Sequence, residues 1–108
     1  MPTAPRLVHD VYFTLNDNSP EACQRLVGSC YDKLAGIRGV QSLLAGTRDP
    51  DLSRDVNDRI YDVSLHVVFV DREAHDAYQN AASHLDFIDE NRSNWRAVRV
   101  FDSTVGER

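Results

Sequence analysis

The stretch that decides the fold is Arg-Ile-Tyr-Asp-Val-Ser-Leu-His-Val-Val-Phe-Val, residues 59–70. Apolar side chains recur there at every second position, at Tyr61, Val63, Leu65, Val67 and Phe69. The intervening positions mix polar with apolar residues. A period of two is typical of a β-strand with one face in a core. We therefore predict a strand over residues 59–70.

Three further strands are predicted from the same kind of pattern. Residues 7–15 place Leu7, His9, Val11, Phe13 and Leu15 on one face of a strand. Residues 40–46 give a weaker strand and residues 96–102 a final one, followed by a polar tail from residue 103. Residues 47–58 show no periodicity, so we expect a polar loop whose role cannot be predicted.

Two helical segments separate these strands. Ser19 is a typical N-cap and Pro20 suits the first helical position, so a helix is predicted from Pro20 to about Ala35. Asp71 is expected to cap a second helix. Ser83, with an aspartate three residues later, resembles a capping box, so this helix is predicted to break near residue 82.

The predicted order is β-α-β-β-α-β, which indicates an α+β, ferredoxin-like fold with an antiparallel sheet and helices on one side. All 108 residues are assigned to a single domain, residues 1–108. The second face of the sheet would stay open and expose a large mixed patch, which includes Val8, Tyr12, Ile60, Val68 and Phe101. We expect a second copy of the chain to cover it, giving a homodimeric α/β barrel with His66 and nearby charged residues in a polar network.

Composition excludes several kinds of partner. The net charge is −5 and no block of basic residues is present, which argues against nucleic acid and anionic membranes. We find no apolar run of the ~20 residues that a membrane span needs. Cys23 and Cys30 are seven residues apart on one helix face and are expected to be core residues. A cytoplasmic location is predicted.

The chain resembles the stress-responsive dimeric α/β-barrel family, the Dabb domain. The resemblance rests on His9, Tyr61–Phe69, Ala77–Gln79, His84–Ile88 and Val100–Asp102. It implies a ferredoxin-like protomer whose sheet packs on that of its twin. Most members of that family have no assigned reaction.

The resemblance extends to a plant polyketide cyclase of this fold and implies three catalytic residues. These are Tyr78, His84, and Asp102 as the carboxylate that supports His84. The chain departs from that cyclase at two places: residues 81–84 read Ala-Ala-Ser-His where a His-Pro-x-His segment is usual, and Val63 replaces a pocket histidine.

Two interpretations of these residues stay open. In the first, His84 exchanges a proton while Tyr78 hydrogen-bonds a substrate oxygen. In the second, His84 and Asp102 form a structural hydrogen bond and Tyr78 is a core aromatic. His9 is predicted to bind ligand, with a satisfied core histidine as the alternative, and His75 is expected to be a solvated helix residue.

No metal site and no cofactor are predicted, because the histidines lack paired spacing and no nucleotide-binding motif is present. The predicted function is therefore that of a stress-responsive A/B barrel homodimer of unassigned reaction, with a pocket for a small aromatic molecule between sheet and helices. The alternative is a cofactor-independent acid–base enzyme, polyketide cyclase-like or monooxygenase-like.

Overall fold

The computed structural model describes residues 5–106. Along this range the elements are β1 (Arg6–Leu15), α1 (Pro20–Leu34), β2 (Val40–Thr47), β3 (Val63–Phe69), α2 (Arg72–Gln79), α3 (Ala82–Asn91), a 3₁₀ turn (Arg92–Asn94) and β4 (Trp95–Val105). The strands form one antiparallel sheet in the order β2-β3-β1-β4. The predicted ferredoxin-like α+β fold is confirmed.

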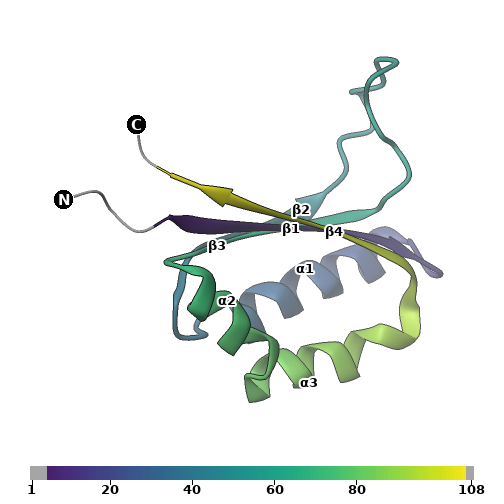
Figure 1. The fold of residues 1–108 in the computed structure, drawn as a ribbon. Helices are drawn as coiled ribbons and strands as arrows, with labels where there is room; N and C mark the ends of the chain where they lie inside the picture. The colour runs from purple at the N-terminus through teal and green to yellow at the C-terminus, as the bar shows by residue number, and fades with distance from the viewer. Residues whose placement is uncertain (1–4, 107–108) are drawn as a thin grey trace.

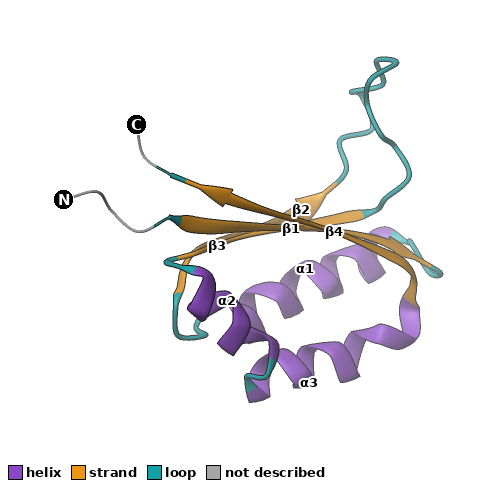
Figure 2. Cartoon of the chain, in the orientation of Figure 1, coloured by secondary structure: helices purple, strands orange, loops and turns teal. Residues whose placement is uncertain are grey.

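The molecule has two layers. All three helices of the described chain lie on one side of the sheet, and the long loop between β2 and β3 rises on the other side (Figures 1 and 2). The sheet therefore has one covered face and one open face. No helix among residues 5–106 is long and apolar enough to cross a membrane.

The alternation in β1 decides which side chains face the helices. Its odd-numbered residues are all buried and its even-numbered residues are only partly so. The buried set packs with α1 and β3 into one core, whose largest members include Phe13, Phe69, Leu34, Leu65 and Tyr78. Such alternation is what a sheet with a single covered face requires.

Two of the three N-caps predicted from the sequence are present in the structure. The Ser19 side chain accepts a hydrogen bond from the Ala22 amide, and the Asp71 side chain does the same for Ala74. The third prediction is wrong, because α3 begins one residue before Ser83 and its N-cap is Ala81, without a side-chain hydrogen bond. The predicted break in the second helix is nevertheless present, since α2 ends at Gln79.

The predicted boundaries of β3 and β4 also need correction. β3 begins at Val63, because the Asp62 carboxylate turns back to accept a hydrogen bond from the Leu15 amide at 2.8 Å. Tyr61 consequently packs on Tyr12 of the open face, with ring centroids 5.0 Å apart, and is not a core residue. β4 continues to Val105, so the first three residues of the predicted polar tail are strand; its last two residues lie outside the described range.

Candidate functional site

A pocket of about 190 Å³ lies between the sheet and the helices, in the region the sequence predicts for a ligand. Side chains of β1, β3 and β4 line it on one side, and those of α2 and α3 on the other. Most are apolar; the polar ones include His9, Tyr78 and His84. Val98 and Val100 of β4 also line it and remain 40% and 49% exposed, so the pocket reaches solvent along this edge.

Tyr78 lies in the last turn of α2 and is 1% exposed. Its ring meets that of Phe69 edge to face, with centroids 4.8 Å apart. Burial is the main cause that raises the pKa of the Tyr78 hydroxyl above its usual value, and the nearby Cys30 thiol adds to it. The hydroxyl therefore keeps its proton at neutral pH and serves as a hydrogen-bond donor.

His84 lies in the first turn of α3, and its ring centroid is 4.5 Å from that of Tyr78. The break between α2 and α3, predicted near residue 82, lets both residues line one pocket. Nδ1 of His84 is 3.2 Å from the carbonyl oxygen of Gln79. Because a carbonyl oxygen only accepts, the proton of a neutral His84 is on Nδ1, which leaves a free electron pair on Nε2.

Burial lowers the pKa of His84, and the hydrogen bond to the Gln79 carbonyl partly offsets this effect. A neutral ring is thereby favoured at pH 7. Neutral His84 with its electron pair on Nε2 can accept a proton from a bound molecule, while Tyr78 can donate a hydrogen bond to an oxygen of that molecule.

The predicted support of His84 by Asp102 is not formed. Asp102 lies opposite His9 in the register of β1 and β4, and its Oδ1 is 2.5 Å from Nδ1 of His9. Asp102 does face the helices, as its strand parity predicts. The register places it beside β1, however, and the carboxylate orients His9 instead of His84.

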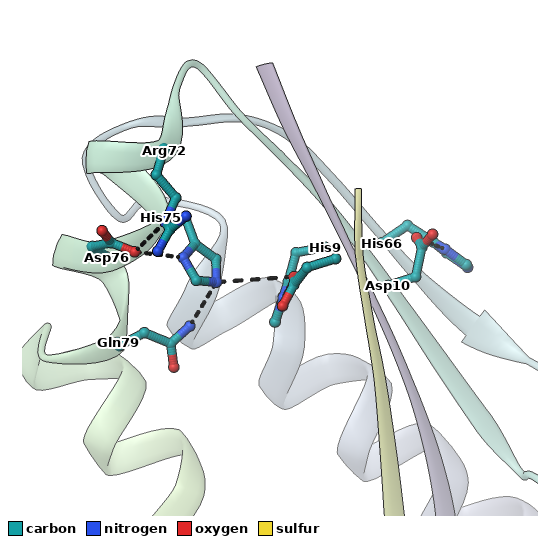
Figure 3. Close-up of polar contacts among 8 residues, drawn as sticks. His9, Asp10, His66, Arg72, His75, Asp76 and Gln79 are labelled. Carbon is teal, nitrogen blue, oxygen red and sulfur yellow. Dashed lines mark hydrogen bonds and ion pairs between the residues drawn. The ribbon is translucent and has the colours of Figure 1, made fainter. Parts of the chain in front are cut away.

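His75 is a site residue that the sequence reasoning missed. It is not a solvated helix residue, since its side chain is only 15% exposed and its ring centroid lies 5.4 Å from that of His9. Figure 3 shows the His75 ring turned from α2 toward His9. The available signal was helical spacing, because His75 is three residues before Tyr78 and so shares its inward face.

Comparison with known families identifies the chain. The sequence profile of the stress responsive A/B barrel domain matches residues 7–105. The chain belongs to this family. The matched range includes both β1 and β4, the strands that carry the His9–Asp102 pair. No curated protein matches the sequence with significance.

Solved structures similar to this A/B barrel include a dimeric ferredoxin-like protein of unknown function from Thermobifida fusca, with 16% identity, 97% and 95% of the two chains covered and a TM-score of 0.79. A Dabb family protein from Mesorhizobium loti has 21% identity, 92% and 95% coverage and a TM-score of 0.76. The hydroxynitrile lyase of Passiflora edulis has 18% identity, 100% and 98% coverage and a TM-score of 0.75. At these identities the likeness is one of fold.

Proposed function

We propose that the chain forms a homodimer through its open sheet face and binds a small aromatic molecule in the pocket between sheet and helices. The observation that carries the proposal is the pocket itself, where Tyr78 and His84 meet with opposite hydrogen-bonding character. Tyr78 offers a donor and neutral His84 an acceptor. An otherwise apolar cavity with a few convergent polar groups is the usual form of a small-molecule site.

Pocket size narrows the ligand class. Sites for drug-sized ligands measure roughly 300–1,000 Å³, whereas a cavity of about 150 Å³ accepts one benzene-sized molecule. At about 190 Å³ the pocket suits a single aromatic ring with one oxygen substituent better than an extended polyketide. This makes simple phenols and aryl ketones the first candidates.

The homodimer is supported by the open face. Phe101 and Leu44 are 51% and 66% exposed on it, since they pair in register with Asp10 and His66. His66 Nδ1 lies 2.8 Å from Asp10 Oδ1, which satisfies both groups if a partner covers them. Several fold relatives are themselves described as dimeric, the Thermobifida fusca protein among them. Covering this patch with a second copy would remove it from water.

Acid–base catalysis is the second candidate function, and the tautomer of His84 favours it. In such a reaction Nε2 of His84 would take a proton from the substrate, and the Tyr78 hydroxyl would stabilise negative charge developing on the substrate oxygen. The fold supports chemistry elsewhere, since one relative is a hydroxynitrile lyase.

A cytoplasmic location belongs to the same proposal. Cys23 and Cys30 are both free and both buried. Free thiols are typical of a reducing compartment.

The test is a proton NMR titration of the His84 ring, assigned by its loss in His84→Gln. The titration is run with and without single-ring phenols and aryl ketones, with a two-ring analogue as the size control. A ring that titrates below its usual pKa and shifts with single-ring compounds supports the pocket, and a screen for proton exchange on those compounds then tests catalysis. A ring that ignores every compound would overturn ligand binding at this pocket.

A further inference from the structure

Three potential metal ligands converge beside the pocket, from three different elements. His9 comes from β1, His75 from α2 and Asp102 from β4, and one ligating atom from each lies within 4.8 Å of the other two. The sequence-based expectation of no metal site rested on the absence of paired histidine spacing. That criterion does not apply to ligands that only the fold brings together.

The hydrogen bonds of His75 indicate which of its ring nitrogens could ligate a cation. Its Nδ1 lies 2.9 Å from Oδ1 of Asp76, and because a carboxylate only accepts, the proton is on Nδ1. Nε2 then carries an electron pair, consistent with the Gln79 side-chain amide 3.4 Å away as a donor. Oδ1 of Asp102 lies 3.9 Å from the same nitrogen.

A cation that bound Nε2 of His75 and Oδ1 of Asp102 would take the place of the long Gln79 contact. Metal–ligand distances of about 2.0–2.2 Å in a tetrahedral zinc site place neighbouring ligand atoms about 3.3–3.6 Å apart. The His75–Asp102 separation of 3.9 Å is slightly longer than this, and the His9–Asp102 separation of 2.5 Å is shorter. Metal binding would therefore require Oδ1 of Asp102 to move away from His9 and toward His75. The metal would replace the hydrogen bond between His9 and Asp102, and the proton of that bond would be released to solvent.

The residues around His9, His75 and Asp102 resemble those that surround metal ligands in proteins. Asp76 orients the His75 ring in the way that carboxylates orient zinc-bound histidines, and Arg72 holds Asp76 at 3.0 Å. The Asp102 side chain is 41% exposed, which gives an ion access from solvent. His9, at 7% exposed, and the mostly buried His75 shield the other side.

We propose that His9, His75 and Asp102 bind a divalent transition-metal ion, with Asp76 as the group that orients His75. Two imidazoles and one carboxylate suit Zn²⁺ and similar ions and leave a coordination position for water or a ligand oxygen. His9 also lines the pocket of Tyr78 and His84, so the two proposed sites adjoin, but metal binding is measured without any pocket ligand.

The experiment uses the full chain without an affinity tag, freed of metal by a chelator. Zn²⁺ is titrated by calorimetry, and Co²⁺ by visible absorption, which reports coordination geometry. The variants are His75→Gln and Asp102→Asn, both on partly exposed side chains, and Asp76→Asn. His66→Gln is the matched control, because His66 forms a similar pair with Asp10 on the opposite face of the sheet (Figure 3).

We expect one ion per chain, with at least about 100-fold weaker binding in His75→Gln and Asp102→Asn, about 10–100-fold weaker binding in Asp76→Asn, and unchanged binding in His66→Gln. Circular dichroism establishes that each variant is folded. The absence of saturable binding to the wild-type chain would overturn the proposal. Binding that is equal in wild type and in folded His75→Gln would do the same.

Discussion

His9 and Asp102 are direct partners across β1 and β4, and their side chains meet at 2.5 Å although 93 positions separate them in the sequence. The pair ties the edge strand to the centre of the sheet on its covered face. Because His9 is 7% exposed, its ring nitrogen has little access to water as an alternative partner.

Replacing Asp102 by alanine is expected to lower the free energy of unfolding by about 1–3 kcal/mol, because a buried ring nitrogen then loses its partner. Chemical denaturation of the metal-free protein measures this. Asp58→Ala is the control, since Asp58 forms an exposed ion pair with Arg99 at 2.8 Å and such pairs contribute little. Equal losses in the two variants would contradict a special role for the His9–Asp102 pair.

The lowered pKa of His84 gives stability a pH dependence of known sign. Below the ordinary histidine pKa of about 6.5 the unfolded chain binds a proton that the folded chain resists, so stability falls as pH decreases through that value toward the lower folded pKa. Above pH 6.5 His84 is neutral in both the folded and the unfolded chain, so this loss of stability is absent. Wild type should therefore lose more thermal stability than His84→Gln between neutral and mildly acidic pH. Parallel curves for the two proteins would contradict this.

Gly39→Ala should destabilise the fold by at least about 2 kcal/mol, because strain and overpacking add. Gly39 has a φ of +92°, and an added Cβ would lie 2.4 Å from Cβ of Ala74 in α2. Gly36→Ala is the matched control, since nothing lies within 4 Å of a Cβ there. Thermal melts of the two variants should differ clearly; similar melting temperatures would show that the turn before β2 can shift at little cost.

The Cys30 thiol is expected to be unreactive in the folded protein. It is 0% exposed, and burial raises its pKa to about 12. Only the thiolate reacts readily with disulfide reagents. In Cys23→Ala, which leaves Cys30 as the remaining thiol, labelling by such a reagent at mildly alkaline pH should follow the unfolding rate. Rapid labelling in native buffer would instead reveal local opening of α1.

Phe101→Glu should convert the proposed dimer into monomer, because it places a charge on the open face, where Phe101 is 51% exposed. Sedimentation velocity at micromolar concentration reports the change. Leu85→Glu is the control: Leu85 is 48% exposed but belongs to α3, on the other side of the sheet. Dissociation by Leu85→Glu alone would place the interface on the helices.

The sequence predicted those features that depend on neighbours along the chain. The alternation in β1 and the caps at Ser19 and Asp71 are local, and the structure confirms them. Tyr61 was assigned to the core because the period of two continues through it. In the structure the Asp62 carboxylate binds the Leu15 amide, and the regular strand begins only at Val63.

For the candidate site, the family resemblance pointed to Tyr78 and His84, and the helix break predicted near residue 82 allows both to line one pocket. Local spacing could not assign the partner of Asp102, since that depends on the register between the first strand and the last. Helical spacing from Tyr78 could have placed His75 on the inward face of its helix. Its proximity to His9 and Asp102 becomes visible only when α2 packs on the sheet.

His9 and Asp10 are neighbours in β1, but their side chains lie on opposite faces of the sheet (Figure 3). His9 contacts Asp102 on the covered face, and Asp10 contacts His66 on the open face. A deletion of one residue early in β1 would exchange them, sending a carboxylate into the core and an imidazole to the outer surface. Selection should therefore remove insertions and deletions in β1, even where the amino-acid composition of the strand varies. Insertions should instead accumulate in the loop between β2 and β3, where strand register is unaffected.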